Sequence, residues 1–211
     1  MTDEPRETTP RRYLRIPHAE PGQTVGLFGG SFNPPHSGHR LVAEVALKRL
    51  GLDQVWWMVT PGNPLKDHGN LAPLGDRLAA VEHFAAHPRM RVTALEARLG
   101  SPYSARTITR LATRRPQVSF VWIMGADNLA TFHRWQDWRS IMRQVPVVVV
   151  DRPGATLSAL WSPTAQTFAR ARWPEEQAGA LARAAAPAWT FLHAPRDPTS
   201  STALRAANGR W

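Results

Sequence analysis

Two histidines follow a glycine-rich turn near the start of the chain, in the run Gly29-Gly-Ser-Phe-Asn-Pro-Pro-His-Ser-Gly-His39. His36 and His39 are spaced so that, at the start of a helix, both rings lie within one turn. Glycines let a backbone approach a phosphate without Cβ clashes, and a helix N-terminus offers unpaired N–H groups at the positive end of its dipole. The pattern therefore predicts a phosphate-binding turn in which both imidazoles donate to phosphate oxygens.

Two other interpretations of His36 and His39 are surface histidines at a helix start and ligands of a metal ion. Structural zinc usually has four protein ligands and catalytic zinc three, whereas no third histidine or carboxylate lies in register near this pair. The chain also contains no cysteine, which excludes disulfides, thiolate zinc sites and thiol nucleophiles. We therefore expect no metal bound by protein side chains.

A second run of phosphate-binding residue types lies near the end of the chain, at Thr199-Ser-Ser-Thr-Ala-Leu-Arg205. Hydroxyl side chains cap helix N-termini and can donate to phosphate, and the Arg205 guanidinium has the forked geometry that suits phosphate oxygens. By itself this run is also typical of an ordinary helix cap. It gains weight beside the first motif, because the carboxyl ends of parallel strands converge on one crevice.

The elements that must position these motifs alternate along the chain between short apolar runs and amphipathic segments. Residues 118–124 and 145–150 are almost wholly apolar, as in strands that are covered on both faces of a parallel sheet. Strands are expected at residues 24–28, 54–59, 90–95, 118–124, 145–150 and 188–192. Helices are expected at residues 38–50, 74–86, 104–113 and 202–207, in two pieces over residues 127–142, and over the alanine-rich residues 156–186 with breaks at Pro163 and Pro174. This order predicts an α/β fold, a single doubly wound, Rossmann-like domain whose parallel sheet is flanked by helices.

Residues 1–22 differ from the rest of the chain, because they are polar, rich in proline and without sustained apolar periodicity. We expect a flexible N-terminal tail over residues 1–22 and one domain over residues 23–211. No apolar run approaches the roughly 20 residues needed to cross a bilayer, and the first residues lack the apolar core of a signal peptide. The sequence therefore predicts a cytoplasmic protein with no membrane partner.

The chain is strongly basic, with 26 Lys plus Arg against 16 Asp plus Glu and a formal net charge of +10 among 211 residues. Such a balance is typical of nucleic-acid-binding surfaces. However, the arginines are spread from Arg6 to Arg210 without a block of like charges, and no stripe of aromatic and cationic residues is present. Small phosphorylated ligands therefore explain the charge better than nucleic acid as the main partner.

The two motifs together resemble those of the bacterial nicotinate-nucleotide adenylyltransferases of the nucleotidylyltransferase superfamily. Gly30 to His39 match the signature G-x-F-[DN]-P-x-H-x-G-H, and Ser201 to Arg205 match the phosphate signature S-T-x-[IL]-R. Further matches in the family's order and spacing lie between them, at Pro61-Gly-Asn-Pro-Leu-Lys66, Tyr103-Ser-Ala-Arg-Thr107, Gly125-Ala-Asp-Asn128 and residues 132–135. The chain departs from the common pattern at Thr199, where the serine run often begins with isoleucine.

The resemblance implies the transfer of AMP from ATP to nicotinate mononucleotide, which gives deamido-NAD and pyrophosphate in NAD biosynthesis. ATP would be a substrate, and Mg²⁺ would arrive on its phosphates rather than on protein carboxylates. The 5′-phosphate of the acceptor is already an anion at neutral pH, so its in-line attack on the α-phosphorus needs no general base. Catalysis would consist of positioning the reactants and stabilising charge. The sequence does not indicate an oligomeric state.

The resemblance also assigns roles to individual residues. The catalytic residues would be His36, His39 and Arg205. ATP and its phosphates would be bound by Gly30, Ser31, Phe32, Gly38, Lys66, Gly125, Asp127, Ser201 and Thr202. Nicotinate mononucleotide would be bound by Ser104, Asp127 and Trp135, with Trp135 stacked on the pyridine ring and Ser104 beside its carboxylate. A plain helix N-cap is the alternative interpretation of Asp127.

Two alternative functions remain open at the level of sequence. Another adenylyl- or cytidylyltransferase of the superfamily, such as a pantetheine-phosphate adenylyltransferase, would share the H-x-G-H turn but not the residues around Trp135. A basic nucleic-acid-binding module would need no ATP chemistry, and its affinity for generic DNA or RNA would fall steeply with salt.

Overall fold

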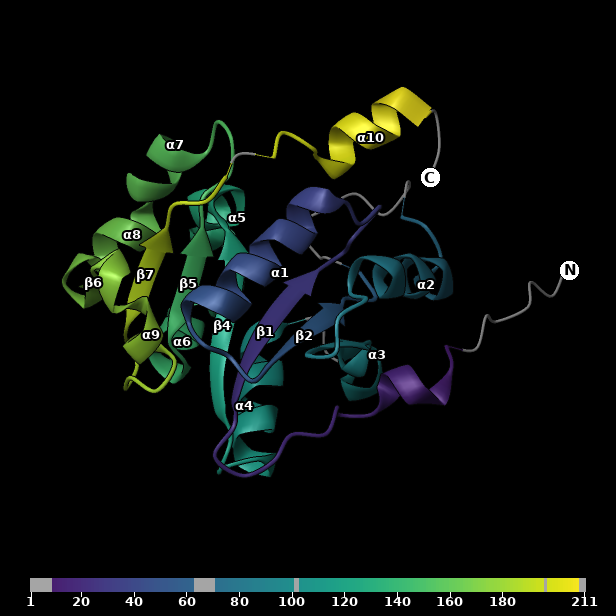
Figure 1. Cartoon of the computed structure of the whole chain (residues 1–211), viewed down its shortest axis with the longest axis horizontal. Coiled ribbons are helices and arrows are strands. Elements are labelled where there is room, and N and C mark those ends of the chain that lie inside the picture. Colours follow the sequence, from purple (N-terminus) through teal and green to yellow (C-terminus); the bar gives the residue numbers. More distant parts are fainter. Residues whose placement is uncertain (1–8, 63–70, 101–102, 196, 209–211) are drawn as a thin grey trace, which may run out of the picture.

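One parallel sheet forms the centre of the protein, in a computed structural model that describes residues 9–62, 71–100, 103–195 and 197–208. Within these ranges seven strands form the sheet in the order β3-β2-β1-β4-β5-β7-β6. The strands are β1 (Thr24–Gly30), β2 (Gln54–Val59), β3 (Met90–Thr93), β4 (Ser119–Gly125), β5 (Val147–Val150), β6 (Arg172–Trp173) and β7 (Trp189–Leu192). Neighbouring strands run parallel, which confirms the expected α/β class (Figure 1).

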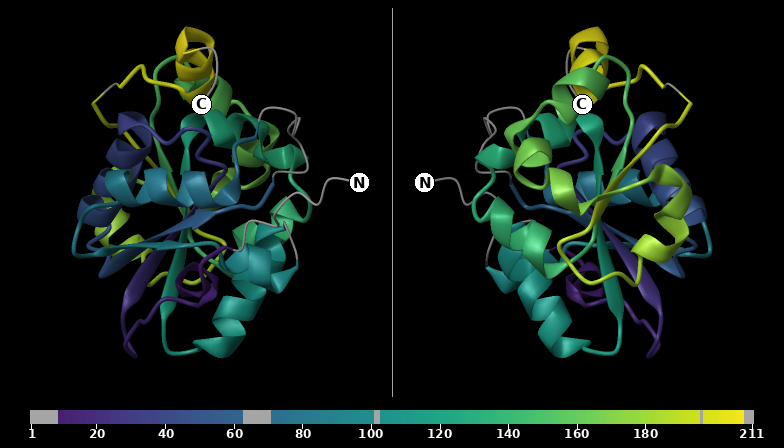
Figure 2. Two further views of the ribbon diagram at one scale, coloured as in Figure 1. Left: turned by 90° about the vertical axis from the view of Figure 1, so that its right-hand side faces the viewer. Right: turned by 90° about the vertical axis from the view of Figure 1, so that its left-hand side faces the viewer.

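Helices cover both faces of the sheet, as the two edge-on views of Figure 2 show. One face is covered by α1 (Ser37–Arg49), α2 (Leu74–Phe84) and α9 (Ala178–Leu181). The other face is covered by α4 (Ser104–Arg114), α5 (Ala126–Thr131), α6 (Trp138–Gln144), α7 (Thr156–Leu160) and α8 (Pro163–Thr167). The remaining helices are α3 (Leu95–Leu99), α10 (Ser201–Asn208) and the short 3₁₀ turns η1 (Arg11–Leu14), η2 (Phe132–Arg134), η3 (Ala169–Ala171) and η4 (Glu175–Gln177). None of the helices in the described ranges is long and apolar enough to span a membrane.

The strands are apolar on both sides because each side meets a layer of helices. In β4, Trp122 and Met124 pack into the core beneath α4 and α6, whereas Val121 and Ile123 pack into the core beneath α1. This alternation follows from the period of two in a strand, and a strand covered twice must be apolar at every position. The continuous apolar runs of the sequence were therefore a sound basis for predicting β4 and β5.

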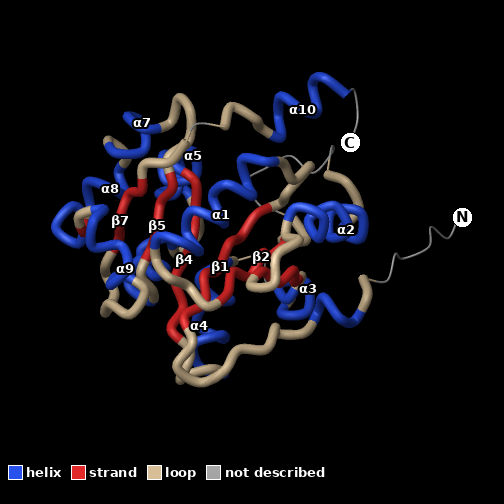
Figure 3. The backbone as a smooth tube through the Cα atoms, viewed as in Figure 1, coloured by secondary structure: helices blue, strands red, loops and turns tan. Residues whose placement is uncertain are grey.

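The strand order reverses between β1 and β4, which are neighbours although α1, β2, α2 and β3 separate them in the chain. Ligands of such sheets bind beside the carboxyl ends of the strands at this switch point. α1 begins directly after β1, and α5 begins directly after β4. The backbone trace shows α5 and α10 at the end of the sheet toward which these strands point (Figure 3).

Residues 9–22 are packed against the domain, which corrects the expectation of a flexible tail over residues 1–22. Tyr13 of η1 is 4% exposed. Its carbonyl accepts hydrogen bonds from the Thr93 hydroxyl at 2.9 Å and from the Ala94 N–H at 2.7 Å. One buried ring and a few backbone hydrogen bonds hold this segment, and neither produces a periodic pattern in the sequence. Residues 1–8 lie outside the described part of the chain.

Residues 156–186 are divided at Pro163 and Pro174, as expected, but they are not helical throughout. They form α7, α8, η3, β6, η4 and α9, and the strand β6 was not expected. Pro163 is the first residue of α8, whose N-cap Ser162 accepts a hydrogen bond from the Ala165 N–H at 3.2 Å. Proline lacks an N–H group and therefore starts helices rather than continuing them. The intervening β6 extends the sheet by pairing with β7.

Candidate active site

A cavity of about 770 Å³ opens at the switch point, between the β1–α1 turn and the β4–α5 turn. Its wall contains most of the residues that the sequence analysis selected, namely Gly30, Ser31, Phe32, His36, His39, Ser104, Gly125, Asp127, Trp135, Ser201, Thr202 and Arg205. Gly38 is not part of the wall, and Lys66 lies outside the described residues. The fold therefore brings the two sequence motifs to one place, as expected from parallel strands.

His36 and His39 occupy the start of α1, with their ring centroids 3.8 Å apart. The backbone N–H of His36 donates to Nδ1 of His39 at 3.2 Å, so the helix cap itself orients the second ring. His36 is 3% exposed, and among the described residues its buried Nδ1 has no hydrogen-bond partner. A buried polar atom without a partner on the wall of a cavity is available to a ligand.

Gly30 and Phe32 shape this turn rather than only lining it. Phe32 has a φ of 46°, a left-handed conformation that a bulky residue rarely adopts. A Cβ atom on Gly30 would lie 2.9 Å from the Phe32 ring, so only glycine leaves room for that ring. The Phe32 ring packs edge-on against His39, with centroids 5.0 Å apart. Gly30 thus admits Phe32, and Phe32 supports the imidazole of His39.

Arg152 is a wall residue that the sequence analysis did not select. It follows β5, and its Nη2 donates to the carbonyl of Thr199 at 2.7 Å. A Cβ atom on Gly38 would overlap Nη1 of Arg152, and one on Gly125 would lie 3.2 Å from its Cγ. Gly38 and Gly125 therefore leave the space through which this guanidinium reaches the start of α1.

The environment of His36 keeps its imidazole neutral at physiological pH. Burial, followed by the nearby Arg152 guanidinium, lowers the pKa of His36 from 6.5 to about 4. The carboxylates of Asp197 and Asp127 oppose this shift with smaller effects. A neutral imidazole has one N–H donor, so His36 would act on an anion as a hydrogen-bond donor while Arg152 supplies the charge.

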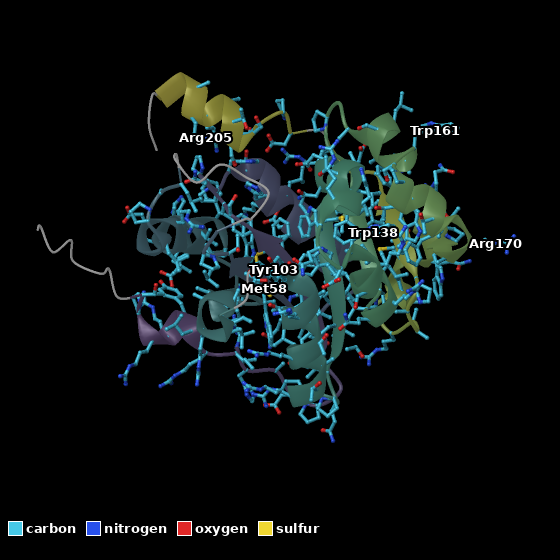
Figure 4. All side chains as sticks on the ribbon, turned by 180° about the vertical axis from the view of Figure 1, so that it is seen from behind. Met58, Tyr103, Trp138, Trp161, Arg170 and Arg205 are labelled. Atoms are coloured by element: carbon cyan, nitrogen blue, oxygen red, sulfur yellow. The ribbon has the colours of Figure 1, made fainter. Side chains whose placement is uncertain are left out.

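α10 is held against the β1–α1 turn by its own signature residues. Ser201 donates through its hydroxyl to the carbonyl of Pro34 at 2.8 Å, and Nη1 of Arg205 donates to the carbonyl of Asn33. Nη2 of Arg205 lies 3.3 Å from the hydroxyl of Thr202, one turn earlier in the helix. Figure 4 shows Arg205 extending from α10 toward the body of the domain. The second motif thus completes the wall that the first begins.

Ser104, Asp127 and Trp135 come to the same cavity from α4, α5 and the segment after η2. Trp135 is half-buried, and its ring meets Phe132 at 5.1 Å and Trp122 at 6.2 Å between centroids. Asp127 is exposed in the first turn of α5 and makes no side-chain cap to that helix. The plain N-cap interpretation of Asp127 therefore finds no support in its contacts.

Several other wall residues carry polar groups that sequence reasoning missed. They are Asn33, Thr60, Glu96, Tyr103, Asn128, Arg134, Gln136, Arg152 and Ser200. A usable signal existed for Arg152, because it is the second residue after the apolar run of β5, at the carboxyl edge of the sheet. No comparable signal existed for Glu96, which is buried by tertiary packing of α3. In the described part of the chain, no group of three or more histidine or carboxylate side chains could hold a metal ion.

Comparison with known proteins agrees with this arrangement. A family described as cytidylyltransferase-like matches residues 27–207. A protein of Rhizobium meliloti named "Probable nicotinate-nucleotide adenylyltransferase" is 63% identical over 183 residues, which are 87% of this chain and 97% of that protein. A protein of Brucella abortus with the same name is 60% identical over 182 residues, covering 86% of this chain and 94% of its own length.

Solved structures show the same fold at much lower identity. Nicotinic acid mononucleotide adenylyltransferase of Plasmodium falciparum, complexed with NaAD, superposes with a TM-score of 0.64 at 13% identity, covering 87% of this chain and 83% of that one. The same enzyme complexed with APC gives a TM-score of 0.63 at 12% identity, with the same shares covered. By the identity and coverage of its bacterial relatives, the chain belongs to the nicotinate-nucleotide adenylyltransferases, within the cytidylyltransferase-like family.

Proposed function

We propose that this protein transfers AMP from ATP to nicotinate mononucleotide, giving deamido-NAD and pyrophosphate in NAD biosynthesis. The observation that carries the proposal is the joint wall of the switch-point cavity. Side chains of the β1–α1 turn and of α10 that can donate hydrogen bonds to phosphate share that wall with Ser104 and Trp135. A transfer between two nucleotides needs both substrates in one cavity, and about 770 Å³ is within the usual range of ligand sites.

The reaction requires positioning and charge stabilisation rather than a nucleophile with its base. The acceptor 5′-phosphate attacks the α-phosphorus of ATP in line and expels pyrophosphate. His36, His39 and Arg152 meet at the start of α1, where donors and a helix N-terminus favour an anion. We assign to these residues the stabilisation of the negative charge on the transferring phosphoryl group. Pre-organised donors of this kind are typically the largest contribution to such catalysis.

The leaving pyrophosphate is assigned to α10, through Ser201, Thr202 and the guanidinium of Arg205. Arg205 already uses Nη1 on the carbonyl of Asn33, which places it beside the turn that carries His36. A forked guanidinium can keep such an anchor and still donate to a phosphate. Lys66 would add a further cation from the loop after β2.

The mononucleotide is assigned to the part of the wall formed by α4, α5 and the segment after η2. Trp135 would stack on the pyridine ring, since its indole is held edge-on by Trp122. The hydroxyl of Ser104 and the N–H groups at the start of α4, whose N-cap Tyr103 makes no side-chain cap, would receive the ring carboxylate. Gly125 and Asp127 would meet ribose hydroxyl groups.

Magnesium is expected to enter with ATP. The phosphate side of the cavity presents imidazoles, hydroxyls and guanidinium groups, which are not the ligands that Mg²⁺ prefers, so the ion would stay on the nucleotide oxygens and neutralise their charge. We also propose that the protein acts in the cytoplasm. Residues 23–211 form the catalytic domain in this proposal, and residues 9–22 pack against it through Tyr13.

The test is steady-state kinetics on one preparation, with ATP and three acceptors, namely nicotinate mononucleotide, nicotinamide mononucleotide and pantetheine phosphate, beside a control without acceptor. Pyrophosphate release should require a mononucleotide, and kcat/KM for the acid should exceed that for the amide by at least about tenfold. An amide would leave a buried donor at the start of α4 unpaired, which costs roughly 1–3 kcal/mol. Release with pantetheine phosphate alone, or a preference for the amide, would overturn the assignment of substrate.

A further inference from the structure

Glu96 is a buried carboxylate on the wall of the active-site cavity, and the proposed mechanism gives it no role. It is the second residue of α3 and is 4% exposed. It shares the cavity wall with Ser104 and Trp135, and its helix packs in the same core as the helix that begins at Ser104. Buried ionisable groups on a cavity wall are candidates for ligand recognition.

The neighbours of Glu96 are neutral. Its Oε1 lies 3.3 Å from the hydroxyl of Thr107, and the hydroxyl of Thr60 also hydrogen-bonds to it. Among the described residues it has no ion-pair partner. Burial raises the pKa of Glu96 to about 7, against the opposing effect of the two threonine hydroxyls. The Thr60 hydroxyl also donates to the carbonyl of Gly62 at 3.0 Å, so these two hydroxyls without a cation are insufficient for a carboxylate removed from water.

The charged side chains on the elements around α3 face other groups. Arg12 of η1 donates to the Tyr13 hydroxyl and lies 3.7 Å from Glu82. Arg110 of α4 donates to the carbonyl of Leu99 at 3.3 Å, on the exposed side of the domain. Arg98 on α3 itself is exposed, as are Arg134 and Asp127 at other points of the cavity wall. Within the described ranges, the structure therefore leaves the countercharge of Glu96 to whatever enters the cavity.

We propose that Glu96 is the counter-ion of the pyridinium ring of the mononucleotide, and that it selects a cationic ring over a neutral one. The inference rests on the proposed function, which brings such a ring to Trp135. The quaternary ring nitrogen carries a permanent positive charge that no change of pH removes. Trp135 offers a π-face to that cation, and Glu96 offers a buried carboxylate on the wall of the same cavity. Both acid and amide mononucleotides carry this cation, so Glu96 acts on the ring and not on its substituent.

Counter-ion pairing predicts release of a proton when the mononucleotide binds. Free Glu96 is partly protonated near pH 7, and the arriving cation favours its ionised form. At pH 7 about half a proton should leave Glu96 per mononucleotide bound, and affinity should fall as pH is lowered below 7. The opposite arrangement, in which protonated Glu96 donates to the ring carboxylate, predicts proton uptake instead.

The experiment is isothermal titration of nicotinate mononucleotide into the full chain in buffers of different ionisation enthalpy. The slope of observed enthalpy against buffer enthalpy counts the protons exchanged, and a purely structural glutamate would not change it. Wild type and the control Glu82→Gln should release about half a proton more than Glu96→Gln at pH 7. Titration of the substrate phosphate contributes equally to all three proteins. Equal release from Glu96→Gln, or proton uptake by wild type, overturns the proposal.

A second measurement compares the oxidised mononucleotide with its 1,4-dihydro form, whose ring is uncharged. At pH 8, Kd for the dihydro form divided by Kd for the oxidised form should be at least tenfold larger in wild type than in Glu96→Gln, because only wild type pairs a carboxylate with the charged ring. Any change in stacking on Trp135 affects both proteins and cancels in this comparison. If Glu96→Gln fails to fold, the proton count of wild type with the two ring forms decides alone. Failure of wild type to form pyrophosphate with the oxidised mononucleotide would refute the proposed function. Turnover with an unchanged Kd ratio would refute only the role of Glu96.

Discussion

Removal of Arg152 should slow AMP transfer far more than removal of an exposed arginine. Its guanidinium lies against Gly38 at the start of α1, and Nη2 donates to the carbonyl of Thr199. Among the described residues its other side-chain nitrogen atoms have no hydrogen-bond partner, which leaves them to a phosphate beside His36. Loss of one pre-organised donor to a developing charge typically costs about 10²- to 10³-fold, or about 2.7–4 kcal/mol. We therefore expect Arg152→Ala to lower kcat/KM for ATP by at least about 100-fold.

Arg170→Ala is the matched control for the change in net charge. Arg170 is exposed in η3 and points away from the domain on the side opposite α10 (Figure 4). Coupled pyrophosphate release, measured with each substrate varied in turn, should show a change of less than about twofold for this variant. Arg152→Lys keeps the charge but loses the fork, so it should recover only part of the lost activity.

The same substitution has a spectroscopic signature at His36. Arg152 contributes to the lowered pKa of His36 after burial, so Arg152→Ala should raise that pKa while leaving it below 6.5. Titration of the imidazole by NMR would measure this shift without any substrate. Activity of Arg152→Ala within threefold of wild type, or an unchanged His36 pKa, would refute the placement of the guanidinium in the phosphate site.

The other predictions concern residues on and off the cavity wall. His39→Ala should lower kcat by about 10²- to 10³-fold with little change in melting temperature, and near-normal turnover would leave His39 as a surface residue. Arg205→Lys should impair pyrophosphate formation, because an ammonium group cannot donate to the carbonyl of Asn33 and also make a bidentate contact with a phosphate. Full activity of this variant would show that Arg205 does not bind phosphate. Deletion of residues 1–20 should lower the melting temperature, because it removes buried Tyr13, and an unchanged melting curve would contradict that packing. Burial raises the pKa of Glu96 to about 7, so this group contributes most to stability below its unfolded pKa and loses that contribution as pH rises through 7. Glu96→Gln without ligand should therefore melt higher than wild type at pH 8 and show a smaller gain at pH 5, and a pH-independent difference would exclude an ionised Glu96.

Sequence patterns predicted the elements whose causes are local or periodic. The apolar run at 118–124 predicted β4 to within one residue, because a strand covered on both faces must be apolar throughout. In the alanine-rich stretch from 156 to 186 the prolines predicted the breaks, but the strand β6 was missed, because its pairing with β7 outweighs local helix propensity. Tyr13 was missed for a related reason, since one buried ring outside any repeat leaves no pattern. Periodicity detects layers of a fold, and it does not detect single contacts across it.

The same distinction explains why the H-x-G-H signature predicts the cavity better than any of its residues alone. Gly30 makes room for Phe32, Phe32 packs against His39, and Gly38 makes room for Arg152. In the signature the imidazoles present polar atoms to a phosphate, while Gly30, Phe32 and Gly38 fix where those atoms and the Arg152 guanidinium lie. Arg152 and Glu96 stand outside the signature because their chemistry depends on neighbours far away in the chain, at Thr199 and at Thr60 and Thr107. A motif thus predicts the part of a site that is formed by residues near one another in the chain. The charged residues Arg152 and Glu96, which complete this site, can be identified only once the arrangement of the strands is known.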